Sequence, residues 1–352
     1  MKFLRVPLAQ AVGEVIAHNF FDVHGRRVST KGQIVTAESA RRLAELGREY
    51  IYVARLTTDD VGENEAAQRI AAAVIGPGIF SPRAATGRAN LKAASGGLLR
   101  INVEAIDAIN EIHDGITIMT LPNHFLVASA QLVATVKIIP FAVPRQSAEA
   151  VEQFGQAQAP ILSVQILPMR RVGLIVTAHQ SGVLADSANP QALMRPHERL
   201  VTEFTPALQA RLAQAGSSLY RTDFTDHEID DIARTIRQQL AGQCEMILIA
   251  SMTAIIDRHD VVPSAIEQIG GKVEHFGVPV DPGNLLLVGY CGTVPVVGLP
   301  GCVRSPKKNA FDLVLPRLLA GDRITRRDLV RLGHGGLLDE IRERHLPREG
   351  ME

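Results

Sequence analysis

The sequence predicts an α/β fold, with a three-layer, largely parallel sheet in a C-terminal domain spanning residues 169–322 and a smaller mixed α+β and β-rich region before it. Two observations predict this. From about residue 170, strand-sized apolar runs alternate with helix-sized amphipathic segments, which is typical of βαβ units and a parallel sheet. Between residues 75 and 145, short β-like runs are instead separated by Gly, Pro and Asn, which favours a small β-rich structure.

Residues 1–75 are expected to form a mixed α+β domain. The stretch 6–17 (VPLAQAVGEVIA) has apolar residues at helical spacing. Thr36 is placed to cap a following helix, which would end near Gly47. Residues 51–56 (IYVARL) then form a strand in this interpretation.

Residues 76–145 are expected to form a small β-barrel or sandwich. The runs at 96–103, 115–121 and 125–143 carry the strand pattern, with a helical turn near Val103 to Ile109. Residues 146–168 are expected to be a helix followed by a linker.

The C-terminal domain is expected to contain strands at 171–178, 218–225, 245–251, 272–280, 285–290 and 294–301, the last two as a hairpin. Helices are expected at 196–216, 226–242, 261–271 and 305–321. Gly216 would close the first helix and Pro263 lies near the first turn of the third. Residues 323–352 are expected to be a C-terminal tail.

Composition excludes several classes of function. Lys plus Arg equals Asp plus Glu at 37 each, Trp is absent and aromatic residues make up only 4%, so we expect no nucleic-acid partner. The three cysteines form no CxxC pair, which argues against a zinc ribbon or a disulfide framework. The N-terminus lacks the pattern of a signal peptide and the apolar runs are strand-sized, so we expect a cytoplasmic protein without a membrane partner.

Unusual residues follow three of the predicted strands, at the edge where parallel sheets bind ligands. Thr177 is followed by His179 and Gln180, and Ser251 is followed by Thr253. The hydroxyl groups are candidate phosphate donors, with ordinary turn chemistry as the alternative. His179 and Gln180 would face the same crevice.

The third segment, residues 299–308, has the features of an anion-binding loop. Ser305 would be the N-cap and Pro306 the first residue of the last helix, so that free backbone N–H groups point out of the helix start. Gly301, Arg304 and Lys307 would complete a cradle for phosphate. A capped helix with solvated basic residues is the alternative. Cys302 lies in the same loop, where the helix start and Arg304 would lower its pKa, although no His–Asp arrangement makes it a nucleophile.

Two carboxylates after the Ser251 strand are candidates for a magnesium site. Asp260 would direct Mg²⁺ over a phosphoanhydride, and its alternative role is the N-cap of the helix at 261–271. Asp257 is the weaker candidate. His259 between them is expected to face solvent.

Residues 247–301 resemble the second half of the molybdopterin-binding domain of molybdopterin molybdotransferases, adenylyltransferases and gephyrin. In the family's strand-end motif, Thr/Ser-Ser-Gly-Gly-x-Ser-x-Gly-x-x-Asp, Ser251 falls on the Ser and Asp260 on the last Asp. The family's Pro-Gly-Lys-Pro and Leu-Pro-Gly-Asn-Pro-x-Ser segments are similar to residues 282–284 and 299–305. The opening of the chain also resembles the first domain of the molybdotransferase type.

The sequence departs from the family at two positions. Met252 and Thr253 replace its double glycine, and Gln180 replaces a carboxylate that would help hold Mg²⁺. By the resemblance, Asp260 and Asp257 are catalytic and Asp260 binds the metal. The cofactor-binding set implied is Thr177, Gln180, Ser251, Thr253, Pro282, Gly283, Asn284, Pro300, Gly301, Arg304, Ser305 and Lys307.

The resemblance implies a molybdenum-cofactor biosynthesis protein that forms homo-oligomers and binds molybdopterin or its adenylylated form. If it catalyses, the reaction would be molybdate insertion with Mg²⁺-dependent release of AMP, which is transferase chemistry. Two alternatives stay open. One is a non-catalytic carrier or sensor that delivers the cofactor to a nucleotidyltransferase or a molybdoenzyme, and the other is a nucleotide pyrophosphatase on the same fold.

Overall fold

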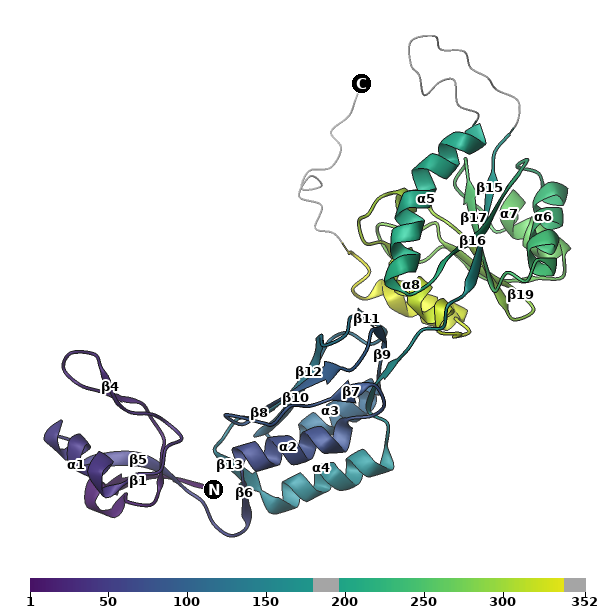
Figure 1. Cartoon of the computed structure of the whole chain (residues 1–352). Helices are drawn as coiled ribbons and strands as arrows, with labels where there is room; N and C mark the ends of the chain where they lie inside the picture. The colour runs from purple at the N-terminus through teal and green to yellow at the C-terminus, as the bar shows by residue number, and fades with distance from the viewer. Residues whose placement is uncertain (180–195, 339–352) are drawn as a thin grey trace, which may run out of the picture. The chain divides into compact units, whose positions relative to one another are not determined.

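The computed structural model describes residues 1–179 and 196–338, and the chain divides into two compact units between Ile166 and Leu167 (Figure 1). Each unit has its own hydrophobic cores and is described by itself. No helix in the described ranges has the length and apolar character needed to cross a membrane.

The first core of the N-terminal unit packs one helix against a small antiparallel sheet. The sheet has the order β1–β5–β2, formed by Lys2–Pro7, Tyr50–Arg55 and Val15–Ile16, and β3 (Phe20–Phe21) pairs with β4 (Arg27–Ser29). Helix α1 (Ala37–Glu45) begins at Thr36, whose side chain accepts a hydrogen bond from the Ser39 backbone N–H. The expected cap, helix and strand are confirmed here.

The helical spacing noted in residues 6–17 does not produce a helix. This stretch contains the end of β1, a short 3-10 turn η1 (Leu8–Gln10) and β2. Strand β1 pairs with β5 along all six of its residues, and Gly13 has a φ of +92°, which ends any helical path. Sheet pairing therefore overrides the local periodicity.

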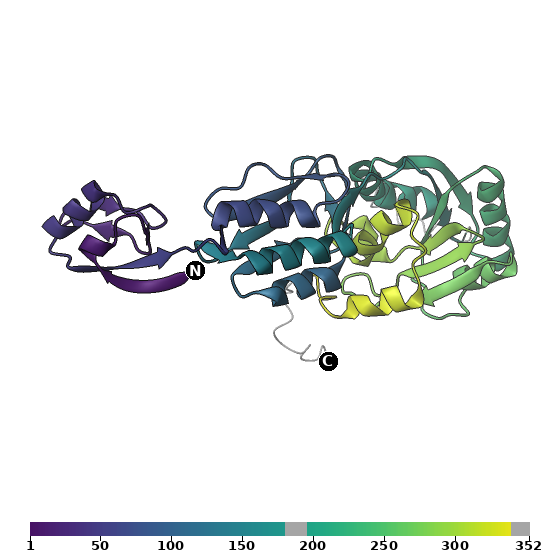
Figure 2. The ribbon, with the colours of Figure 1, turned by 90° about the horizontal axis from the view of Figure 1, so that it is seen from below.

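The second core of the N-terminal unit runs continuously from Val61 to Val164. It joins α2 (Glu63–Val74), α3 (Val103–Ile112) and α4 (Arg145–Ala157) to short antiparallel strands, and α2 and α4 lie side by side in both views (Figure 2). The strands are β6 (Asp60–Gly62), β7 (Ile79–Phe80), β8 (Arg88–Ala93), β9 (Gly97–Ile101), β10 (Ile116–Thr120), β11 (Leu126–Val127), β12 (Leu132–Ile138), β13 (Ala142–Pro144) and β14 (Leu162–Gln165). Residues 76–145 are thus not a separate barrel, because the helices at their two ends share their core.

The C-terminal unit contains a six-stranded sheet in the order β16–β15–β17–β20–β19–β18. The strands are β15 (Arg171–Thr177), β16 (Ser218–Thr225), β17 (Met246–Ser251), β18 (Lys272–Phe276), β19 (Leu287–Cys291) and β20 (Val294–Gly298). β16, β15, β17 and β20 are parallel to one another. β19 is antiparallel to both of its neighbours, β20 and β18. The expected largely parallel α/β sheet is confirmed.

Helices cover both faces of this sheet. α6 (Ile229–Ala241) and α7 (Val261–Gln268) share a core with Ile175, Ile247 and Ile249, and α5 (Pro196–Gln214) and α8 (Ala310–Leu319) cover the other face (Figure 1). The apolar strands read as continuous runs because both faces are buried.

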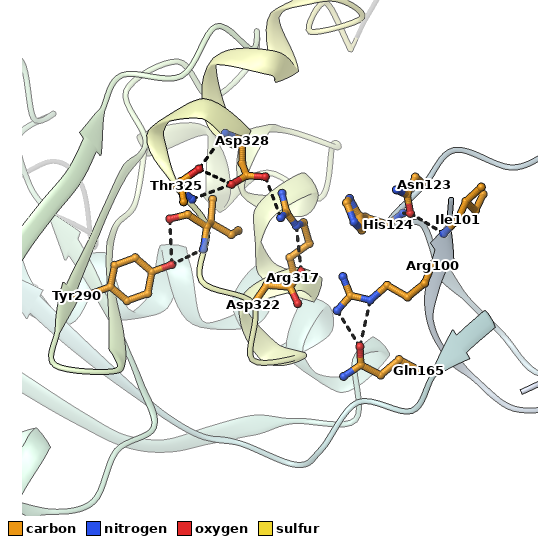
Figure 3. A network of polar contacts seen from close by, with 11 residues as sticks. Arg100, Ile101, Asn123, His124, Gln165, Tyr290, Arg317, Asp322, Thr325 and Asp328 are labelled. Atoms are coloured by element: carbon orange, nitrogen blue, oxygen red, sulfur yellow. Dashed lines mark hydrogen bonds and ion pairs between the residues drawn. The ribbon is translucent and has the colours of Figure 1, made fainter. Parts of the chain in front are cut away.

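The segment after α8 belongs to the same unit. In α9 (Arg326–Val330), Thr325 is the N-cap and Asp328 pairs with Arg317 of α8, which also pairs with Asp322 (Figure 3). The Tyr290 hydroxyl accepts a hydrogen bond from Ile324 N at 2.8 Å. Residues expected to be a tail are therefore packed as far as the short 3-10 turn η4 (Arg331–Gly333). In the N-terminal unit, Figure 3 also shows Arg100 bonded to Gln165 between β9 and β14.

The last long helix starts four residues later than the sequence predicts. Residues 301–304 form the 3-10 turn η3 (Gly301–Arg304), Ser305 ends it, and α8 begins after Asn309. The Asn309 side chain accepts from Phe311 N while Asp312 accepts from Asn309 N, so these two residues form a capping box. Ser305 as N-cap is wrong, because the better cap follows it.

This correction predicts different costs for two substitutions. Asn309→Ala should lower the free energy of unfolding of the C-terminal unit by about 1–2 kcal/mol, because a buried cap is lost. Ser305→Ala should cost about 0.5 kcal/mol or less, as expected of a partly exposed residue outside the cap. Urea unfolding followed by hydrogen exchange of β15 and β17 peptides measures both. The reverse order would restore Ser305 as the cap.

Candidate functional site at the carboxyl edge of the sheet

The carboxyl ends of β15 and β17 bring two predicted ligand residues side by side. Thr177 is in register with Ser251 on one side and with Thr225 of β16 on the other. Parallel pairing aligns the strand ends, so residues 74 positions apart in the chain become neighbours. This strand register brings together Thr177 and Ser251, which the sequence predicted as ligand residues.

A histidine that the sequence interpretation did not single out lies at the centre of this edge. His227 follows β16 and is 7% exposed. Its Nδ1 is hydrogen-bonded to the hydroxyl of Thr177, and its Nε2 lies 3.3 Å from the hydroxyl of Thr253. Thr177 is fully buried and Thr253 is exposed, so the ring links a buried hydroxyl to one at the surface.

Two polar atoms at the same edge have no hydrogen-bond partner in the described part of the chain. They are the hydroxyl oxygen of Ser251 and Oδ1 of Asp226, the residue before His227. A buried polar atom without a partner costs free energy, so such atoms in a native protein call for a water, an ion or a ligand group. The edge therefore has unused hydrogen-bonding capacity.

The surroundings of the His227 ring disfavour its charged form. Burial, and then the neighbouring His179, lower its pKa below the ordinary value of 6.5, and Asp260 and Glu228 oppose this. His179 is exposed, and its ring meets that of His227 edge-on with 5.5 Å between centroids. Two imidazoles thus lie side by side at this edge of the sheet.

Asp260 is the N-cap of α7, the role that the sequence analysis gave as its alternative. Oδ1 accepts from Val261 N at 2.7 Å and Oδ2 accepts from Ile256 N at 3.0 Å. Asp257 is exposed and accepts from the backbone N–H of His259, which lowers the pKa of the Asp257 carboxyl. No three His, Cys, Asp or Glu side chains gather as metal ligands within residues 1–179 and 196–338.

The loop at 303–307 is organised by Arg211 of α5, a second residue that the sequence analysis missed. Arg211 is 8% exposed and donates to the carbonyls of Val303, Ser305 and Lys307 at 2.9–3.0 Å. It also forms a two-pronged pair with Asp312, at 2.7 and 3.3 Å. One buried guanidinium therefore ties α5, the loop and the start of α8 together.

The predicted phosphate ligands in this loop already have partners. Arg304 pairs with Glu203 of α5 at 2.8 Å, a carboxylate that it shares with Arg199, and it lies over the ring of Phe204. The backbone N–H of Lys307 donates to the Ser305 hydroxyl. Burial raises the pKa of the Cys302 thiol, which is the opposite of the expected lowering.

Residues 282–284 are shaped by packing against α8. A Cβ on Gly283 would lie 2.6 Å from Ala310 N, and the Gly283 φ is +120°. The Pro282 carbonyl accepts from Ala310 N, and the Asn284 carbonyl accepts from Val278 N. In the 299–305 loop, Pro300 is buried, whereas a Cβ on Gly301 would meet open space. Gln180 lies outside the described residues.

A separate cavity of about 550 Å³ lies at the opposite, amino edge of the sheet. Arg170, Arg171 and Glu245 line it before β15 and β17, and Tyr290 and Arg323 line its other side. Glu245 pairs with both Arg170 and Arg171, and Arg323 lies over the Tyr290 ring. Three arginines therefore line this cavity together with the carboxylates of Glu245, which Arg170 and Arg171 share, and of Asp322, which pairs with Arg317.

Comparison with known proteins gives limited matches. The family model described as "Domain of unknown function (DUF8806)" matches residues 5–55. None of the curated proteins matches the chain.

Several solved structures are similar in part. For the molybdopterin biosynthesis MoeA protein from Pyrococcus horikosii the TM-score is 0.33 at 13% identity, covering 93% of this chain and 75% of that one. A molybdenum cofactor biosynthesis protein from Pyrococcus furiosus has a TM-score of 0.25 and 12% sequence identity, and the match covers 94% of this chain and 65% of that one. A molybdopterin biosynthesis protein from Mycobacterium abscessus has a TM-score of 0.27 and 12% sequence identity, and the match covers 44% of this chain and 93% of that one. This chain thus spans 65% of the Pyrococcus furiosus protein, and TM-scores of this size do not by themselves establish a common fold.

Proposed function

We propose that the C-terminal unit binds molybdopterin, or its adenylylated form, through the phosphate group at the carboxyl edge of the sheet, and that the protein serves molybdenum-cofactor biosynthesis. The observation that carries the proposal is the cluster of Thr253, His227 and the unpartnered Ser251 hydroxyl at this edge. Open parallel sheets bind ligands at this edge. The resemblance of residues 247–301 to the molybdopterin-binding domain supplies the identity of the ligand.

Binding is favoured over molybdate insertion. Magnesium takes carboxylate oxygens in addition to phosphate, and both oxygens of Asp260 already accept backbone N–H groups. Asp257 is exposed and bonded to His259. Because Asp260 and Asp257, the carboxylates expected to hold Mg²⁺, are engaged in this way, we propose the carrier role ahead of the transferase and pyrophosphatase alternatives. In the carrier role the protein passes the cofactor to a nucleotidyltransferase or a molybdoenzyme.

A matched pair of threonine substitutions tests the binding site. Thr253→Val keeps the shape of an exposed residue and removes its hydroxyl, so it should weaken molybdopterin binding about 2- to 10-fold, the value of one hydrogen bond, at unchanged stability. Thr293→Val makes the same change at the exposed turn that lines the amino-edge cavity and should leave binding unchanged. Anaerobic equilibrium dialysis gives both affinities. A loss of molybdopterin affinity in Thr293→Val alone would place the binding site at the amino edge of the sheet.

A further inference from the structure

Two imidazoles, those of His227 and His179, lie at the carboxyl edge and can each become positive by taking up a proton. The carboxylates of Asp260 and Glu228 act on the His227 ring in the direction that favours its charged form. A phosphate ester carries close to two negative charges at neutral pH. A phosphate bound beside His227 would favour the protonated form of the ring, so the protein can balance the ligand's charge by taking up a proton.

The hydrogen bonds of His227 show how a proton would be used. A neutral imidazole has one nitrogen that donates and one that accepts. When Nε2 accepts, the Thr253 hydroxyl gives its hydrogen to the ring and has none left for a ligand. When both nitrogens are protonated, Nδ1 donates to Thr177 and Nε2 donates to Thr253, so the Thr253 hydroxyl is free to donate to an anion whichever tautomer the neutral ring had.

We propose that His227 makes the carboxyl edge a proton-coupled, metal-independent site for a phosphate ester. The phosphate accepts a hydrogen bond from Thr253, and the ring nitrogen that lacked a hydrogen takes one proton from solvent. No other bond forms or breaks. His179, whose ring meets that of His227 edge-on at the surface, lies where a second imidazole contributes to the same anion. This inference rests on the proposed function and adds the way in which the ligand's charge is balanced.

The electrostatic consequence has a definite sign. In the free chain burial and His179 lower the pKa of His227 below its ordinary value, which favours the neutral ring at pH 7.0. A nearby phosphate stabilises the charged ring and raises this pKa. The groups that act on the ring are His179, which lowers its pKa, and Asp260 and Glu228, which raise it. Binding at pH 7.0 must then consume protons.

Calorimetry of molybdopterin binding at pH 7.0 with EDTA, in buffers of different ionisation enthalpy, counts these protons. The wild-type chain should bind without a metal and take up protons. His227→Gln, which keeps hydrogen-bonding groups but cannot become charged, should lose the uptake and bind about 10- to 100-fold more weakly, as for a charge-assisted hydrogen bond. His275→Gln is the control, because His275 is also partly buried with a lowered pKa but lies on β18 away from the cluster, and it should change neither quantity.

Three outcomes overturn the inference. Binding that requires Mg²⁺ and is lost in Asp226→Asn, but persists in His227→Gln, would assign the charge balance to a metal at the unpartnered Asp226 oxygen. Metal-free binding with proton uptake unchanged in His227→Gln would show that the His227 ring is not the group that takes up the proton. Both results leave the proposed function standing, whereas absence of binding by the wild-type chain would overturn it as well.

Nitrogen-15 NMR of the histidine rings in the wild-type chain repeats the test without any variant. On addition of molybdopterin, one buried ring should change from the neutral to the protonated shift pattern. A buried ring that stays neutral while the ligand binds would contradict the inference.

Discussion

Arg211→Met should lower the free energy of unfolding of the C-terminal unit by about 3–5 kcal/mol, the largest effect expected of a single charged side chain in this chain. The substitution keeps apolar volume in α5 but leaves three loop carbonyls and the Asp312 carboxylate without their donor. The cost arises because these groups lie in a partly buried network that water does not easily enter. The start of α8 should loosen too, since Asp312 is also half of its capping box.

Arg199→Met is the matched control for this prediction. Arg199 lies on the same helix and pairs with Glu203 at 2.8 Å, but its side chain is 65% exposed. Exposed i,i+4 pairs contribute about 0.5 kcal/mol or less. Urea unfolding, with hydrogen exchange of β15 and β17 peptides to isolate the C-terminal unit, compares the two. Equal effects would mean that Arg211 does not hold the loop.

Gly283→Ala should destabilise the C-terminal unit by about 2–6 kcal/mol. The φ of +120° is a conformation that L residues rarely adopt, which costs roughly 1–3 kcal/mol. The added Cβ would also lie 2.6 Å from the backbone nitrogen of Ala310, and relieving such overpacking costs roughly 1–3 kcal/mol more. The first turn of α8 would have to move.

The resemblance implies that Gly283 and Gly301 both bind the cofactor. Gly301→Ala tests whether ligand binding at Gly301 can be changed without an effect on packing. Its new Cβ meets no atom within 4 Å, so stability should change by less than about 1 kcal/mol. If Gly301 lies against a bound ligand, only the affinity for molybdopterin should fall. A large loss of stability in Gly301→Ala with none in Gly283→Ala would contradict the packing described for this loop.

The sequence predicted the strands and helices of the C-terminal unit because its signals are long and consistent. The central residues of β15 (VGLIV) and β17 (MILIA) are apolar and buried, as expected when helices cover both faces of a sheet. The start of α8 was missed because Ser305-Pro306 and Asn309 both suit a helix start. Only the reciprocal bonds of Asn309 and Asp312 distinguish them.

The N-terminal unit was harder to predict for a physical reason. Its strands are short, and residues 6–17 have helical spacing although β1 pairs with β5, more than forty residues away. The core that joins α2 to α4 depends on contacts across some eighty residues, such as the pair between Arg69 and Glu152 at 2.8 Å. Local periodicity carries no information about such contacts.

Part of the candidate site could be predicted from the sequence. Thr177 and Ser251 were found because strand ends are recognisable and parallel strands align them. His227 was missed because it lies in the polar stretch before a helix, where nothing local separates it from a solvated residue. A histidine two residues after the predicted strand 218–225, at the edge where the other candidates gather, was the available signal.

A structure of the chain bound to molybdopterin, prepared at pH 7.0 in EDTA, tests the central claim most directly. The account predicts the phosphate group at the carboxyl edge of the sheet, within hydrogen-bonding distance of the Thr253 hydroxyl and beside His227. A phosphate in the cavity at the amino edge, between Arg171 and Arg323, would contradict it.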